Sequence, residues 1–185
     1  MKKKIVFLLT LLLTLTLAGA ALANTEDRMK DMVQTYLDEN GQDYVYDDYV
    51  FTLKLAIGSA LEYADVRIFI YDDMLSVIAD APVQVSEENF EKMAVFTTLA
   101  NNEIFYGQFR VDREHGYVSC RSCNLVEDVI PGENELFYLV GMPLEYLETY
   151  GYGIVAVCEG GDPCEAFNAC LAAMDEYTRK EKAPL

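Results

Sequence analysis

Apolar residues change their spacing along the first half of the chain, and the change predicts the order of its elements. From Thr25 to Glu39 they recur every three or four positions, which predicts a helix with one buried face. The residues of this face are Met29, Met32, Val33, Tyr36 and Leu37. Apolar and polar residues then alternate in three runs, Val50–Ile57, Asp65–Tyr71 and Leu75–Val85. Alternation of period two predicts antiparallel strands that bury one face of a sheet.

The second half of the chain begins with another predicted helix, for which Ser86 is the expected cap. The residues expected on its inner face are Phe90, Met93, Ala94 and Thr97. Alternation returns from Gln108 to Asp112 and from Tyr117 to Ser122, which predicts a hairpin. A further helix is expected from about Pro143 to Cys158, because proline suits the first position of a helix.

The last predicted helix follows Gly160–Gly161, a glycine pair that can end the helix before it. Asp162 is its expected N-cap and Pro163 its first residue. Its buried face consists of Ala166, Phe167, Cys170, Leu171 and Met174. This order of elements predicts an α+β fold, a single domain with an antiparallel sheet of about five strands and helices packed on one face.

The N-terminus has the pattern of an export signal. Three lysines precede a long apolar run, and the small residues Ala21–Ala23 close it, which predicts a signal peptide over residues 1–23. The domain then covers residues 24–178 and a charged tail covers 179–185. An uncleaved anchor is the alternative, because the run from Ile5 to Ala23 is just long enough to span a bilayer. We favour cleavage, which makes the chain secreted or extracytoplasmic, with no membrane contact afterwards.

Strong acidity narrows the choice of partners. The formal net charge is −17, with 31 acidic against 14 basic residues. Nucleic acid and anionic membrane surfaces would be repelled by such a chain. A protein or peptide partner is therefore expected, and a homodimer is compatible with the sequence.

Cys120 and Cys123 form a C-x-x-C pair within one of the predicted strands. A redox centre, a metal site, a disulfide and two unrelated cysteines are the alternatives. If the strand runs unbroken through both, their Cα atoms are roughly 10 Å apart, at about 3.3 Å per residue, and the side chains lie on opposite faces. A disulfide spans at most about 7 Å, so the continuity of this strand decides between the alternatives.

Cys158 and Cys164 are better candidates for a disulfide. They flank the short connection between the last two predicted helices, and such a bridge, called here the helix staple, is chemically allowed in an exported protein. Five cysteines leave at least one unpaired.

The remaining reactive residues give no catalytic arrangement. His115, the single histidine, lies in a predicted hairpin turn, which favours an exposed residue. Without a second histidine a histidine-rich metal site is excluded, and neither a metal nor a cofactor is expected. Tyr44, Tyr46 and Tyr49 lie among acidic residues, where they either pack an edge strand or form a binding patch.

The segment LANNEIFYGQFRVDREHGYVSCR, residues 99–121, resembles the YbjN-domain family. It shares an asparagine at a helix end, a strand of the form G-x-F-x-hydrophobic-D, a turn and a return strand. IADAPVQVSEENFEKM before it and LEYLETYGYGIVAVCEGGDPCEA after it extend the resemblance over nearly all of the chain beyond the signal. The resemblance implies a fold like that of type III secretion chaperones and brings no catalytic residues with it.

These observations together predict an exported, non-enzymatic module that binds a protein or peptide, with a chaperone-like or regulatory role. The alternative is an extracytoplasmic redox or metal-binding protein that uses Cys120 and Cys123.

Overall fold

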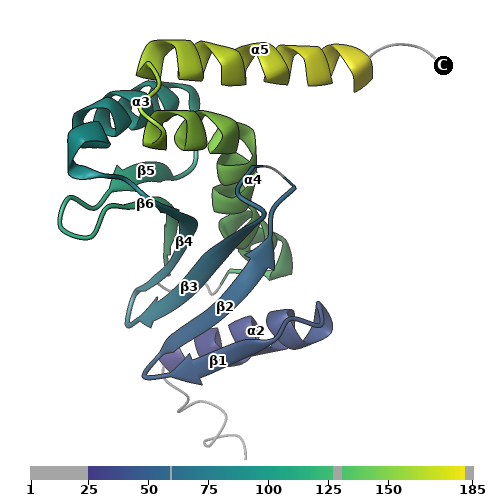
Figure 1. Ribbon diagram of the computed structural model, residues 1–185. Helices are drawn as coiled ribbons and strands as arrows, with labels where there is room; N and C mark the ends of the chain where they lie inside the picture. Colours follow the sequence, from purple (N-terminus) through teal and green to yellow (C-terminus); the bar gives the residue numbers. More distant parts are fainter. Residues whose placement is uncertain (1–24, 59, 127–130, 182–185) are drawn as a thin grey trace, which may run out of the picture.

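The computed structural model describes residues 25–58, 60–126 and 131–181. It shows one α+β domain with a six-stranded antiparallel sheet in the order β1-β2-β3-β4-β6-β5 (Figure 1). The predicted fold class is thereby confirmed, with one strand more than expected. The predicted signal peptide lies outside the described residues. The elements are α2 (Thr25–Glu39), β1 (Tyr44–Asp47), β2 (Val50–Ala56), β3 (Tyr63–Tyr71), β4 (Met74–Gln84), the 3₁₀ turn η1 (Glu87–Asn89), α3 (Phe90–Glu103), β5 (Gln108–Val111), β6 (Tyr117–Leu125), α4 (Glu133–Cys158) and α5 (Pro163–Glu181).

The first helix and the three strands that follow it lie close to where the apolar pattern places them. Met29 and Val33 of α2 are fully buried, and Phe51 pairs with Ile68 across β2 and β3. The additional strand is β1, which joins β2 through a two-residue turn. Asp48 and Tyr49 in this turn have φ values of 44° and 61°, as a tight type I′ hairpin requires.

Helix α4 begins at Glu133 and not at Pro143, so the predicted start of this helix is wrong. Proline has no N–H for the carbonyl four residues before it, and this normally ends or kinks a helix. Here the carbonyl without a backbone donor is that of Leu139, and the Ser122 hydroxyl of β6 donates a hydrogen bond to it at 2.6 Å. The bond from the sheet replaces the missing backbone donor, and the helix continues through the proline.

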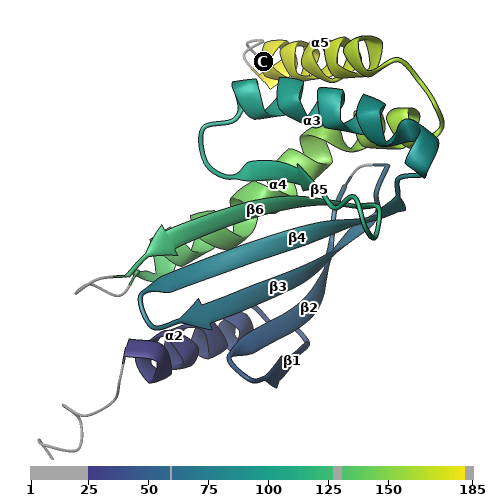
Figure 2. The same ribbon diagram turned by 90° about the vertical axis from the view of Figure 1, so that its left-hand side faces the viewer.

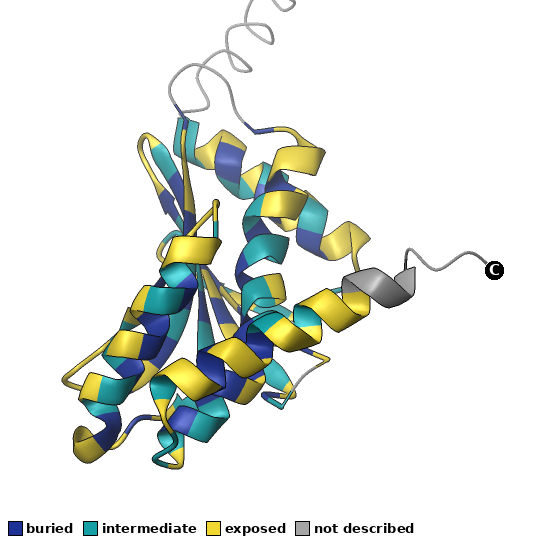
Figure 3. Cartoon of the chain, turned by 90° about the horizontal axis from the view of Figure 1, so that it is seen from above, coloured by how far each residue is buried: buried dark blue, intermediate teal, exposed yellow. Residues whose placement is uncertain are grey.

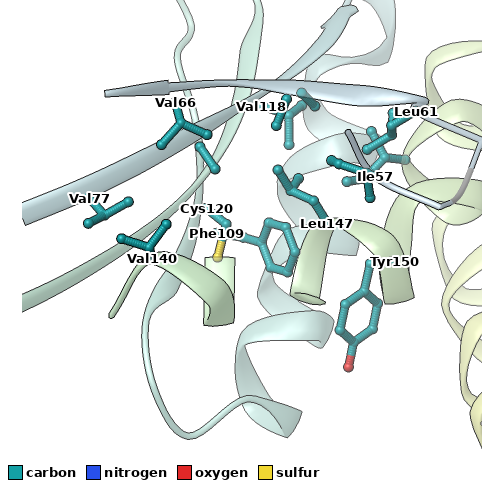
Figure 4. Packing of buried hydrophobic residues seen from close by; sticks show 14 of the residues in the cluster. Ile57, Leu61, Val66, Val77, Phe109, Val118, Cys120, Val140, Leu147 and Tyr150 are labelled. Atoms are coloured by element: carbon teal, nitrogen blue, oxygen red, sulfur yellow. The ribbon is translucent and has the colours of Figure 1, made fainter. Parts of the chain in front are cut away.

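The core lies between one face of the sheet and the helices. Figure 4 shows Val66, Val77, Cys120 and Phe109 of the sheet close to Val140 of α4. Toward its C-terminal end α4 contacts α3 and α5, and Gly153 permits this close packing. A Cβ atom at that position would lie 2.5 Å from the Phe96 ring and 2.8 Å from the Cys170 sulfur.

The last helix begins as the sequence predicts. Oδ1 of Asp162 accepts hydrogen bonds from the backbone N–H groups of Cys164, at 2.9 Å, and Glu165, at 3.0 Å. Gly160, with a φ of 93°, ends the helix before it. Figure 3 shows that α5 lies at the outside of the molecule and exposes much of its length.

The second face of the sheet has no helix over it among the described residues. Figure 2 shows β6, β4, β3 and β2 lying in front of α4, with this face toward the viewer. None of the described helices combines the length and the apolar character that crossing a membrane requires.

Candidate functional site

One edge of the sheet is only partly paired. Strand β5 pairs with β6 from Val118 to Arg121, and the last pair along β6 joins Arg121 to Gln108, the first residue of β5. Strand β6 continues to Leu125 and keeps β4 as its partner on the other side. Beyond Arg121 the outer edge of β6 therefore has no strand partner within the part of the chain that the structure describes.

The backbone groups of Cys123 and Leu125 point out from this edge. Val126, the next residue, donates its backbone N–H to the Asp73 carbonyl, on the β4 side. On the β5 side, the Tyr117 carbonyl accepts a hydrogen bond from the backbone of Asp112. Because successive residues of a strand face opposite neighbours, the odd-numbered residues of β6 face away from β4. Cys123 and Leu125 thus offer N–H and C=O groups to an incoming strand.

The neighbouring part of the same edge is closed by a side chain. Asn101, at the end of α3, accepts a hydrogen bond from the Phe109 N–H at 2.7 Å and donates one to the Phe109 carbonyl at 3.0 Å. The amide thereby occupies the positions of a pairing strand along β5. An exposed edge is a liability that proteins usually cover, so the uncovered section of β6 stands out.

A groove of about 590 Å³ lies beside the uncovered edge. Ser122, Cys123 and Asn124 form one wall, and the first turns of α4 form the other. The residues that complete the lining are Tyr106, Gly107, Glu135, Tyr138, Leu139 and Met142. We call this space the edge groove. Its character is apolar and aromatic, with Glu135 as the ionisable carboxylate in its lining.

Two local features give the edge groove its shape. The hydrogen bond from Ser122 to Leu139 holds α4 against β6. Gly107 has a φ of 100°, and a Cβ atom there would lie 2.7 Å from the Arg121 carbonyl oxygen. A side chain at this position would collide with the strand, so glycine lets the loop bring Tyr106 to the end of the edge.

Large apolar side chains of residues that line the edge groove, or that are next in sequence to its lining, remain in solvent. Tyr106 is 73% exposed and Tyr138 is 63% exposed. Phe105, Leu125 and Phe137 are also exposed, at 93%, 66% and 58%. Exposed aromatic residues concentrated around one groove are typical of an interaction site.

The two cysteines of the C-x-x-C pair lie on opposite faces of β6. The strand runs unbroken through both, which is the condition set by the sequence. Cys120 is fully buried, and this burial raises the pKa of its thiol to about 12. Cys123 is exposed in the wall of the edge groove. The strand therefore does not bring the two thiols to one ligand.

Cys158 is the last residue of α4, and Cys164 lies in the first turn of α5. Both are free cysteines in this structure. Burial raises the pKa of the Cys158 thiol, with a smaller effect from the nearby Glu159 carboxylate. The helix staple stays a prediction that a thiol titration can test.

The three tyrosines proposed as a binding patch are half-buried. Tyr44 and Tyr46 pack against Phe51, with ring centroids 5.3 and 4.6 Å apart from it. The Tyr44 hydroxyl donates a hydrogen bond to Asp38 of α2 at 3.0 Å. Together with Tyr49 these residues pack against the core and connect α2 to the edge of the sheet. This placement favours their role in packing.

His115 lies in the β5–β6 turn and is exposed, as the sequence predicts. Its Nδ1 atom lies 3.0 Å from Oδ2 of Asp112. This hydrogen bond and the carboxylate charge raise the pKa of His115, and the same hydrogen bond lowers the pKa of Asp112. Among the described residues no three histidine, cysteine or acidic side chains come together as a metal site would need.

Sequence reasoning did not find the edge groove. A signal was present, because Phe105–Tyr106 and Phe137–Tyr138 are adjacent apolar pairs. Each pair lies beside acidic residues, Glu103 before the first pair and Glu133 and Glu135 before the second, where large aromatic side chains are not needed for the core. Such aromatic pairs in polar surroundings are typical of an exposed interaction surface.

The chain is similar to the solved structure of YbjN from E. coli, for which a role as a transcription regulator has been suggested. The two are 14% identical, the TM-score is 0.52, and the match covers 70% of this chain and 88% of that one. At this identity the likeness shows the fold alone, and the YbjN-like fold expected from residues 99–121 is confirmed. No family model and no curated protein matches the chain.

Proposed function

We propose that the chain is an exported, non-enzymatic module that holds an extended segment of a partner protein along the outer edge of β6. The observation that carries this proposal is the unpaired backbone of Cys123 and Leu125 directly beside the edge groove. Strand addition of this kind takes affinity from main-chain hydrogen bonds and specificity from pockets for alternate side chains. The likeness to YbjN agrees with a binding role and adds no site.

The lining of the edge groove defines the occupant. Apolar side chains on alternate residues of the segment would lie against Tyr106, Tyr138 and Met142. A lysine or arginine of the segment would pair with Glu135, and the net charge of −17 favours a basic partner overall. The partner segment is therefore extended, apolar on one face and positively charged.

A display library of random dodecapeptides, selected on the purified chain, tests the proposal. We expect selected sequences with alternating apolar residues and at least one basic residue. Cys123→Pro removes an outward N–H and leaves the ladder to β4 intact, because proline is tolerated where the N–H faces solvent. This variant should bind the selected peptides at least tenfold more weakly, since a hydrogen bond and the fit of the strand are lost.

Cys123→Ser is the matched control, because it keeps the backbone N–H and removes only the thiol. Affinity should change by less than about twofold, with circular dichroism confirming that both variants fold. Equal binding by the two variants would refute strand addition at β6. Loss of binding in Cys123→Ser would instead support a role for the thiol, which is the alternative that the C-x-x-C pair raised.

Export is tested separately. We expect the chain recovered from the medium or the cell envelope to begin at Asn24. An intact N-terminus in a membrane fraction would favour the uncleaved anchor.

A further inference from the structure

The uncovered face of the sheet carries a concentration of arginine that the overall charge does not predict. Four arginines line one hollow of about 410 Å³, in a chain with 14 basic and 31 acidic residues. They are Arg67, Arg110, Arg113 and Arg121, and the acidic residues in the same lining are Asp80 and Asp112. We call this site the arginine hollow. It lies over β3, β4, β6 and β5, and on β6 it adjoins the edge groove, because Arg121 lines the hollow and Ser122 lines the groove.

Strand register arranges three of these arginines in a stripe. Arg67 pairs with Ile78, and Ile78 pairs with Arg121, so the three side chains lie on one face in one row. Two strand spacings separate Arg67 from Arg121, roughly 10 Å. Arg110 pairs with Ser119 in the next row, diagonal to Arg121 at roughly 7–8 Å.

Two of the arginines are held in place from the sheet itself. Arg67 donates a hydrogen bond to Asp80 at 2.7 Å, and the two form an ion pair. Nε of Arg121 donates one to the hydroxyl of Ser76 at 3.0 Å, which leaves the outer guanidinium nitrogens free for a ligand. Ser76 is 1% exposed, so the hydroxyl that anchors Arg121 is shielded from solvent.

Arg110 differs from its neighbours. It is exposed, and its side chain has no hydrogen-bond or ion-pair partner among the described residues. Arg113, in the turn, lies with its guanidinium carbon 5.3 Å from the centre of the Phe90 ring. The stripe thus combines two fixed guanidinium groups with one that is unpaired.

We propose that the arginine hollow binds an acidic, extended polypeptide segment. A guanidinium presents paired donors that match a carboxylate. Carboxylates on alternate residues of an extended chain are roughly 7 Å apart, and three of them span a stripe of the observed length. The acidity of the rest of the chain disfavours long polyanions such as nucleic acid, whereas a short acidic segment meets the local excess of positive charge.

A fluorescein-labelled peptide of alternating glutamate and serine is the probe, with alternating glutamine and serine as its neutral counterpart. We expect the purified chain to bind the acidic peptide and not the neutral one, with an affinity that falls as salt is added. Arg110→Gln should weaken binding about tenfold or more, because it removes a charge-assisted hydrogen bond. Since the Arg110 side chain is exposed and has no partner among the described residues, its substitution leaves the core untouched.

Arg28→Gln is the matched control, since it makes the same charge change on the exposed side of α2 and should alter affinity by less than about twofold. Equal weakening by Arg28→Gln and Arg110→Gln would overturn the proposal, as would binding of the neutral peptide. Tighter binding of an oligothymidylate than of the acidic peptide would overturn the proposal, because the ligand would then be a nucleic acid. A dimer that is abolished by Arg110→Gln would also overturn it, because a second copy of the chain would then occupy the arginine hollow.

Tyr138→Ser separates this proposal from the edge groove. It should leave the affinity for the acidic peptide unchanged and lower the affinity for the peptides selected on the edge groove. The two proposals therefore fail independently of each other.

Discussion

Gly153 gives the sharpest test of how the helices are packed. Its position in α4 faces Phe96 of α3 and Cys170 of α5, and an added Cβ would lie within 2.5 to 2.8 Å of both. Phe96 cannot easily move away, because it is fully buried and packs edge-to-face against Tyr150. Gly153→Ala should therefore force the three helices apart locally.

Gly141 in the same helix provides the control for the magnitude. A Cβ added there meets no atom within 4 Å. Alanine in place of glycine favours a helix by about 0.5–1 kcal/mol at either position. Overpacking of a filled core costs about 1–3 kcal/mol. The intrinsic gain cancels in the comparison, so the two variants should differ in the free energy of unfolding by about 1–3 kcal/mol.

Urea unfolding followed by circular dichroism measures this difference. With a urea dependence of about 1–3 kcal/mol per molar, the two midpoints should be separated by about 1 M. Gly141→Ala should unfold at or slightly above the wild-type midpoint, and Gly153→Ala below it. A Gly153→Ala chain as stable as Gly141→Ala would refute the close packing of α3, α4 and α5.

Three further predictions concern single contacts. Ser122→Ala should lower the free energy of unfolding by about 1 kcal/mol, because it leaves the half-buried Leu139 carbonyl without its donor. The loss should be much smaller in a Pro143→Ala background, where the helix supplies its own donor, and equal losses in both backgrounds would exclude the replacement bond. In a proton NMR titration, the raised pKa of His115 should fall toward 6.5 in Asp112→Asn. The raised His115 pKa stabilises the turn below about pH 6.5, and this stabilisation is lost as the pH rises through the folded-state pKa. The lowered Asp112 pKa stabilises the turn above about pH 4, so the pairing contributes most at mildly acidic pH. A His115 titration that is unchanged in Asp112→Asn would contradict this pairing. If the helix staple forms, the denatured chain should release two more thiols with reductant than without it, and five free thiols before reduction would exclude it.

The elements that the sequence predicts correctly are those whose signals are local. The apolar face of α2 and the cap at Asp162 depend on residues a few positions apart. The start of α4 could not be predicted, because its continuation through Pro143 depends on a hydroxyl from another element. The same holds for the edge groove, which exists because β5 begins opposite Arg121 and leaves the last four residues of β6 without a strand partner on that side among the described residues. Strand lengths across a sheet are a tertiary property that apolar alternation does not encode.

Strand β1 was missed for a different reason. Tyr44 and Tyr46 have the alternation of a strand, but the acidic residues on either side, Asp43, Asp47 and Asp48, resemble an exposed loop. The turn at Asp48–Tyr49 has no glycine to signal its positive φ values. Packing on Phe51 and the hydrogen bond to Asp38 outweigh these weak local preferences.

The uncovered edge of β6 has a consequence for the behaviour of the free chain at high concentration. An open edge is a template on which copies of a protein aggregate by intermolecular strand pairing. A net charge of −17 opposes this, because like-charged copies repel each other over about 10 Å at 0.1 M salt and over only about 3 Å at 1 M. The acidity that narrows the choice of partners thus also limits self-association through the open edge at low salt concentration. At about 1 M salt this repulsion is screened, and the chain should aggregate more readily.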